Sequence, residues 1–236
     1  MNVTNEINKI LNIKDSYQAP KRIMDILCGD RDKRDEVFKQ FLELFKYDVT
    51  FDWFHEYFQD EHADRKKKKQ DFTPQSISKL LSSFVNSEDG TYYEPAAGTG
   101  GVLIQKWHDD RMQHSPFDYM PSSYFYTAEE LSDRTIPFLL FNMLIRGMNG
   151  VVVQCDVLTR EAYGAWFIQN DDNDHFHFSS LNKLPQTKMI ERELNVKFVE
   201  DNYPEIKQTT EWPVWLGDVS EYVSGLKRCK ACELST

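Results

Sequence analysis

The segment TYYEPAAGTGG, residues 91–101, constrains the fold more strongly than any other part of the 236-residue chain. An extended, aromatic run leads into a cluster of small residues, and helix-forming sequence follows from Val102. Gly98, Gly100 and Gly101 permit positive φ angles and remove the Cβ atoms that would keep a ligand away from the backbone. We therefore expect a strand, a tight turn and a helix whose unpaired N–H groups face a ligand.

The residues around the turn narrow the class of ligand. Gly101 is followed by Val102 and Leu103, where a phosphate loop carries Lys and Ser or Thr, and the third glycine of a dinucleotide fingerprint is missing. Glu94, just before the glycines, would repel a diphosphate and attract an ammonium group. This pattern favours S-adenosylmethionine, which carries an ammonium, a carboxylate and a sulfonium. A tight turn without a ligand remains the alternative explanation.

From residue 91 onward, strand-like and helix-like segments alternate. We expect strands at 91–95, 122–130 and 151–158 and helices at 100–112 and 134–148. Whether residues 165–171 form a further strand is left open. Such alternation predicts an α/β, Rossmann-like domain with a parallel sheet and helices on both faces. Ligands of such sheets lie beyond the carboxyl ends of the strands.

The sequence before residue 64 predicts helices. Val37, Phe38, Phe41, Leu42 and Phe45 recur at helical spacing, and we expect them to pack in a core.

The aromatic pattern continues in FDWFHEYFQDEH, residues 51–62, for which core packing is again the favoured reading. A basic run, Arg65 to Lys69, then suggests a solvated loop, with a phosphate-facing loop as the alternative.

Four segments, in order, resemble N6-adenine DNA methyltransferases, most closely the modification subunits of type I restriction enzymes and phage-type N6 DNA methylases. EPAAGTGG at 94–101 resembles the cofactor loop of that family, where the acid is usually aspartate. DFTP at 71–74 precedes it, while AEELSDRTIPFLLFNMLIRGM at 128–148 and CDVL at 155–158 follow. The resemblance covers residues 50 to about 160 and implies a class I S-adenosylmethionine-dependent methyltransferase fold.

The resemblance implies three regions: an α-helical N-terminal segment (1–70), a methyltransferase-like S-adenosylmethionine-binding domain (71–224) and a tail (225–236). Cys229 and Cys232 form a C-x-x-C in the tail. No second pair of metal ligands lies nearby in the sequence, so we expect free thiols and a reducing compartment.

The resemblance also assigns roles to residues of the cofactor site. Glu130 would accept hydrogen bonds from the ribose hydroxyls, with Glu129 as the alternative, and its spacing to Asn142 fits the family. Asp156 would accept the adenine amino group, Phe72 would stack on or close over the cofactor, and Thr73 would bond its carboxylate. The full set of expected cofactor-binding residues is Phe72, Thr73, Glu94, Pro95, Ala96, Gly98, Thr99, Gly100, Glu130 and Asp156.

The sequence departs from the family at the catalytic loop. It has no Asn/Asp-Pro-Pro-aromatic tetrapeptide, whose side chain and carbonyl accept the protons of the target amine and whose aromatic ring stacks on a flipped base. Asn170 is the expected catalytic substitute, with Phe176 or Phe178 stacking on the base, and Asn182 is the alternative.

The acidic run NDDND, residues 170–174, lacks the glycine and terminal glutamate of a calcium loop, so we expect a solvated turn and no metal.

The net charge and the length of the chain limit the partners that we expect it to bind. The net charge of −10 opposes tight DNA binding by this chain alone, so DNA would be reached through a local basic patch or a partner subunit. About fifty residues follow Pro185, which is too few for a large target-recognition domain. We find no signal peptide and no membrane span, so we expect a cytoplasmic protein.

Three functions remain open. The first is a DNA adenine N6-methyltransferase, or its cofactor-binding subunit, with a degenerate catalytic loop. The second is an inactive homologue that acts as a regulator, decoy or interaction subunit in restriction or phage–host conflict. Methylation of a protein or small molecule is a third, less favoured class.

Overall fold

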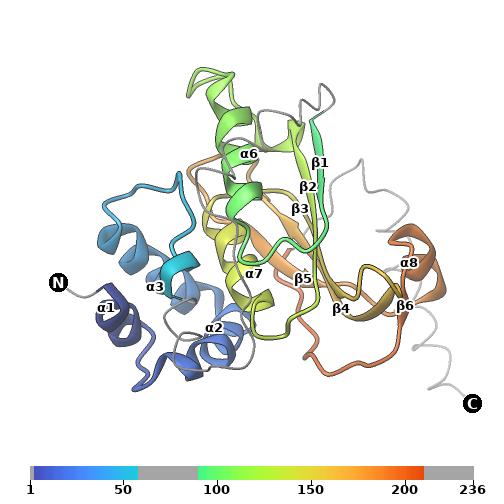
Figure 1. The fold of residues 1–236 in the computed structure, drawn as a ribbon. Helices are drawn as coiled ribbons and strands as arrows, with labels where there is room; N and C mark the ends of the chain where they lie inside the picture. Colours follow the sequence, from blue (N-terminus) through green and yellow to red (C-terminus); the bar gives the residue numbers. More distant parts are fainter. Residues whose placement is uncertain (1–2, 58–89, 210–236) are drawn as a thin grey trace, which may run out of the picture.

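The computed structural model of the protein describes residues 3–57 and 90–209. The N-terminal part contains helices α1 (Val3–Ile10), α2 (Ala19–Leu27) and α3 (Arg31–Leu44). The second part is α/β (Figure 1). Its strands are β1 (Thr91–Glu94), β2 (Phe125–Glu130), β3 (Gly150–Cys155), β4 (Glu161–Gln169), β5 (Ser180–Lys183) and β6 (Lys197–Phe198). Its helices are α6 (Gly101–Met112), α7 (Ile136–Ile145) and α8 (Lys188–Glu193).

The sheet has the order β1-β2-β3-β4-β5, with β6 paired to β4. β1, β2 and β3 are parallel, as the sequence predicts, and α6 and α7 form the crossovers between them. β4 runs antiparallel to β3, and β5 antiparallel to β4. The expectation of an all-parallel sheet is therefore wrong after residue 155. The connection at 156–160 is too short for the crossover that a parallel neighbour requires, so the chain turns back as a hairpin.

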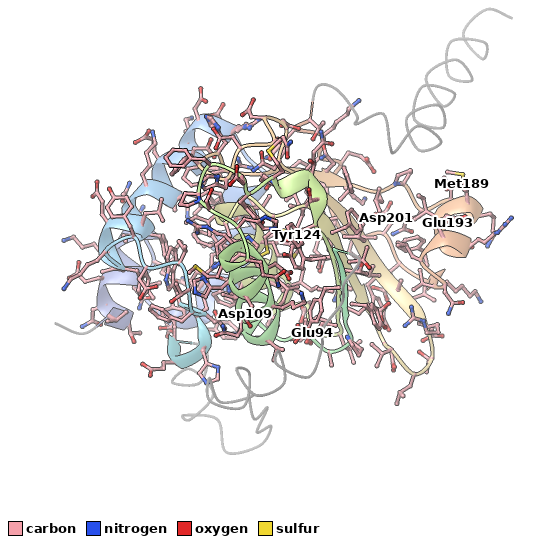
Figure 2. The ribbon with its side chains drawn as sticks, turned by 90° about the horizontal axis from the view of Figure 1, so that it is seen from above. Glu94, Asp109, Tyr124, Met189, Glu193 and Asp201 are labelled. Atoms are coloured by element: carbon pink, nitrogen blue, oxygen red, sulfur yellow. The ribbon has the colours of Figure 1, made fainter. Side chains whose placement is uncertain are left out.

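Helices cover both faces of the sheet, as expected. α6 and α7 lie on one face, and their buried side chains share a core with Tyr126, Ala128 and Val152 of the sheet. The other face carries a smaller core in which Ile190 of α8 packs with strand residues such as Phe167. Figure 2 shows Met189 and Glu193 on α8, on the side of the molecule away from the N-terminal helices.

The N-terminal helices share their core with the α/β part. α7 is buried over its whole length because the sheet lies on one side and α2 packs on the other. The ring of Phe38 in α3 contacts Phe141 edge-on, with centroids 4.6 Å apart, and Phe54 packs against Phe138 at 4.8 Å. The predicted core role is confirmed for the aromatic residues that the structure describes in both stretches: Phe38, Phe41, Trp53, Phe54 and Tyr57 are buried, and Phe45 and Phe51 pack against them half-buried.

Local capping explains where α3 begins. The side chain of Asp30 accepts a hydrogen bond from the backbone N–H of Lys33 at 3.1 Å, which satisfies one of the donors left open at a helix start. Proline in the first turn of α7 needs no such partner, because it has no N–H to satisfy.

Candidate cofactor site

The glycine turn joins β1 to α6 in the way the sequence predicts. Gly98 and Gly100 have φ angles of 59° and 94°, a region that residues with a Cβ rarely adopt. A Cβ on Gly100 would lie 3.0 Å from Cδ1 of Leu139, so α7 also limits the space behind the turn. Gly100, the N-cap of α6, has no side chain to accept the first N–H groups of that helix, and one of them, that of Leu103, donates to Glu94.

Glu130 lies at the turn, at the carboxyl end of β2. Its Oε2 accepts the backbone N–H of Gly98 at 2.8 Å, and its Oε1 accepts the N–H of Ser132 at 2.9 Å. Each carboxylate oxygen retains lone-pair capacity for a further donor, such as a hydroxyl group. The residue is 7% exposed and is held in a fixed position by these two bonds.

Glu129 points to the opposite face of the sheet, and its carboxylate already has hydrogen-bond partners in the protein. Arg160 forms two hydrogen bonds with its carboxylate, both 2.7 Å, and Tyr93 donates a third at 2.9 Å. Burial on its own would raise the pKa of Glu129, but the hydrogen bonds from Arg160 and Tyr93 and the charge of Arg160 together outweigh it, so the pKa is lowered. The carboxylate therefore works as an ionised anchor of the β3–β4 hairpin.

Glu94 ends β1 on the same face as Tyr92, beside α6 (Figure 2). Tyr92 donates to its Oε2 at 3.1 Å, and the backbone amide of Leu103 in the first turn of α6 is a second donor. Burial outweighs both donors and raises the pKa of Glu94 to about 7. A cation placed beside this carboxyl would favour its ionised form.

Asp156 directly follows β3, so it lies at the same edge of the sheet as Glu94 and Glu130. Its Oδ1 accepts the N–H groups of Leu158 and Thr159 at 2.8 and 3.2 Å, the geometry of a turn. Oδ2 makes no hydrogen bond that involves the described residues.

Two exposed leucines flank this edge of the sheet. Leu131 follows β2 and is 50% exposed, and Leu158 follows β3 and is 89% exposed. Apolar side chains next to a few polar groups are typical of small-molecule sites. The sequence did not predict a role for either leucine, although Leu131 lies one residue after Glu130 and Leu158 lies two residues after Asp156.

A buried polar network lies behind the turn. Thr99, 1% exposed, donates its hydroxyl proton to the carboxylate of Asp52. Asn142 donates to Asp52 and to the carbonyl of Thr99, and Arg146 donates to the side chain of Asn142. Burial raises the pKa of Asp52, while these donors and the charge of Arg146 oppose the rise. The sequence signal for this network was an acid within an aromatic run and an asparagine within an apolar helix.

The expected catalytic residues lie elsewhere. Asn170 follows β4, and none of its hydrogen bonds within the described residues involves the glycine turn. Its backbone N–H donates to the side chain of Asn149, which precedes β3. It therefore lies at the amino-terminal edge of the parallel strands, opposite the turn. Its side chain ties together Gly147, Asp174 and His177 and so holds a loop.

Asn182 and the two phenylalanines also lie apart from the turn. Asn182, in β5, is buried, and its side chain bonds Phe167, Gln208 and Thr209. Phe178 packs on Phe38 with ring centroids 5.1 Å apart, and Phe176 is exposed in the loop held by Asn170.

The remaining expected residues divide into two groups. Pro95 and Ala96 are exposed in the turn, and Ala96 has a positive φ of 55°. Phe72, Thr73, the basic run at 65–69 and the tail cysteines lie outside the described residues.

In the acidic run, Asp171 bonds Arg31 and Ser180. Within 3–57 and 90–209, no group of three or more His, Cys, Asp or Glu residues could hold a metal ion. The same residues include no helix with the length and apolar character to cross a membrane.

The parallel strands, their crossover helices and the glycine turn with acids at neighbouring strand ends define the class of S-adenosylmethionine-dependent methyltransferases. The sequence model of the N-6 DNA Methylase family matches residues 46–183, which is more than half of the chain. The chain belongs to this family, so the predicted family and the α/β fold class are confirmed. No curated protein matches the sequence.

Two solved structures are similar to this chain. One is described as a modification subunit of a type I restriction enzyme from Vibrio vulnificus YJ016, with 15% identity and a TM-score of 0.41 over 55% of this chain and 28% of that one. The other is described as a class I S-adenosylmethionine-dependent methyltransferase from Listeria monocytogenes, with 12% identity and a TM-score of 0.40 over 66% of this chain and 55% of that one. This chain therefore matches less than two thirds of the length of either protein.

Proposed function

We propose that this chain binds S-adenosylmethionine at the glycine turn and serves as the cofactor-binding subunit of a DNA adenine N6-methyltransferase. The hydrogen bond from Gly98 to Glu130 carries this proposal, because it joins the bare turn to the acid at the end of the next strand. A ligand that lies against the turn then meets a carboxylate suited to a pair of ribose hydroxyls. Membership of the N-6 DNA methylase family supports the same ligand.

The other residues at this edge complete a nucleoside site. Glu94 would face the ammonium group, and Asp156 would accept the adenine amino group through its second oxygen. Leu131 and Leu158 would cover the two sides of the adenine ring, because both are exposed just beyond neighbouring strands.

The transfer also requires an acceptor besides Glu94, Glu130 and Asp156, which the proposal assigns to the cofactor. When bound, S-adenosylmethionine supplies a methyl group activated by its sulfonium. The amino nitrogen that receives this group must lose a proton, so the site needs a hydrogen-bond acceptor beside that nitrogen. Asn170 lies at the opposite edge, so we propose that a partner subunit or a segment outside the described residues supplies the acceptor and contacts DNA.

Calorimetry with S-adenosylmethionine tests the cofactor proposal. Wild-type protein is expected to bind, and Glu130→Gln is expected to bind at least about tenfold more weakly, because an amide accepts hydroxyl protons less well than a carboxylate. Glu193→Gln is the control, since Glu193 is exposed on α8, which packs on the other face of the sheet. No binding of S-adenosylmethionine or its demethylated product by wild type would refute the proposal.

A second candidate function is supported by the missing tetrapeptide: an inactive homologue that keeps the cofactor site and acts as a regulator, decoy or interaction subunit. Methyl transfer from labelled S-adenosylmethionine to unmethylated duplex and single-stranded DNA separates the two. Label in DNA, with the chain alone or with a co-purified partner, supports the methyltransferase subunit. Cofactor binding without transfer under every condition supports the inactive homologue.

A further inference from the structure

The glycine turn is anchored from behind by the N-terminal part of the chain. Thr99, between the two glycines of positive φ, turns its side chain away from solvent, and its hydroxyl donates to Asp52, which lies 47 residues earlier. The backbone N–H of Phe54 donates to the same carboxylate at 3.0 Å. Asp52 is therefore fixed within its own loop and can hold Thr99 in one orientation.

Asn142 of α7 holds Thr99 through a second contact. Its side-chain nitrogen donates to Asp52 at 2.9 Å and to the carbonyl oxygen of Thr99 at 2.8 Å. Its side-chain oxygen accepts from Arg146 at 2.8 Å, which fixes the orientation of the amide. Both the side chain and the carbonyl of Thr99 are thus held, and every polar group named here has a partner.

Arg146 extends the same network to the backbone before Asp52. Its guanidinium donates to the carbonyl oxygens of Val49 and Phe51 at 2.9 and 2.7 Å and lies over the ring of Trp53. The loop that carries Asp52 is therefore clamped to α7 on both sides of the carboxylate.

We propose that Asp52 is a positioning residue of the cofactor site, which holds the glycine turn in the shape that receives the ligand. Gly98 and Gly100 cannot fix this shape alone, because glycine adopts many backbone conformations at little cost. A turn that is ordered in advance loses less conformational entropy when a ligand binds, so the anchor raises affinity without touching the ligand. The identity of the ligand rests on the proposed function, but the anchoring role does not.

Three variants test the effect on binding. Thr99→Val keeps the shape of the side chain and removes the hydroxyl, and it is expected to weaken S-adenosylmethionine binding about tenfold by calorimetry. Thr99→Ser restores the hydroxyl and is expected to stay within about twofold of wild type. Asp52→Asn should also weaken binding, and its combination with Thr99→Val should be less than additive, because both remove the same bond.

Phe38→Leu is the matched control for stability. Phe38 packs on α7 from the same N-terminal part and has no polar contact with the turn. It is expected to lower the melting temperature and leave the dissociation constant unchanged. Binding by Thr99→Val and Asp52→Asn within about twofold of wild type, in folded protein, would overturn the proposal.

Amide hydrogen exchange of the ligand-free protein supplies a readout that needs no cofactor. Thr99→Val is expected to speed exchange at Gly98 and Gly100 at least about tenfold, while amides of β4 stay as in wild type. Unchanged exchange at the turn would overturn the anchoring role. If wild type binds no S-adenosylmethionine, the proposed function fails, and hydrogen exchange still decides whether Asp52 holds the turn.

Discussion

At the scale of single residues, environment rather than residue type separates the acids of the sheet. Glu129 and Glu130 are neighbours in sequence but face opposite sides of β2, so one bonds Arg160 and the other bonds the glycine turn. Glu94, with neutral donors and partial burial, has a raised pKa instead. The three glutamates therefore differ in environment: Glu129 binds Arg160, Glu130 binds the glycine turn, and Glu94 has only neutral donors.

Glu94 makes the stability of the protein dependent on pH. Its folded-state pKa of about 7 lies above the value of roughly 4.3 for an unfolded glutamate. The protonated carboxyl therefore stabilises the fold fully below about pH 4, and this stabilisation is lost as the pH rises through about 7. We expect the free energy of unfolding of wild type to fall, relative to Glu94→Gln, by up to about 3 kcal/mol between about pH 4 and pH 8. Urea denaturation across this range measures the difference, and parallel curves would contradict the assignment.

We expect that replacing Gly98 disrupts the candidate cofactor site. Gly98→Val places a branched side chain at a φ of 59°, so we expect loss of S-adenosylmethionine binding by calorimetry and a destabilisation of about 1–2 kcal/mol. Gly147→Ala is the control, because Gly147 has a φ of 66° at the opposite edge of the sheet. It should be destabilised and still bind. Retained affinity in Gly98→Val would show that the ligand does not touch the turn.

At the scale of elements, α7 is the common wall between the two parts of the chain. It is apolar all around because it contacts the sheet and the N-terminal helices together. Its polar residue Asn142 and the residue that caps its end, Arg146, belong to the buried network. The N-terminal helices are therefore part of the core that supports the turn.

Phe41 in α3 tests this shared core. Its ring is buried and lies 4.8 Å from that of Phe141 in α7. We expect Phe41→Ala to lower the free energy of unfolding by about 3–5 kcal/mol in a single urea transition. Phe117→Ala, at a side chain that is 95% exposed, should stay within about 0.5 kcal/mol of wild type. Two separate transitions would show that the helices and the α/β part fold independently.

At the scale of the whole molecule, the hairpin after β3 decides which residues lie at the same edge of the sheet as the glycine turn. This hairpin reverses the direction of β4, so Asn170 lies at the edge of the sheet opposite the glycine turn. The catalytic role expected of Asn170 requires its side chain to lie at the same edge of the sheet as the glycine turn. The direction of one strand thus excludes Asn170 from this position in the structure.

Asn170→Ala separates the structural position of this residue from its expected catalytic one. The side chain makes three hydrogen bonds within the loop at 170–178 and a fourth to the carbonyl of Gly147, so we expect a destabilisation of about 2 kcal/mol by urea denaturation. Affinity for S-adenosylmethionine, measured by calorimetry, should not change. A loss of methyl transfer with unchanged stability would instead support the catalytic role expected from sequence.

The sequence by itself determined the strand, glycine turn and helix at 91–112, the acids that end neighbouring strands, and the family. These features depend on side-chain periodicity, glycine conformation and local order along the chain, which a sequence carries directly. Only the tertiary structure decided the direction of β4, the position of Asn170 and the place of Asp52 behind the turn. Strand direction is set by pairing, and a contact across 47 residues is set by packing, so neither leaves a periodic signal in the sequence.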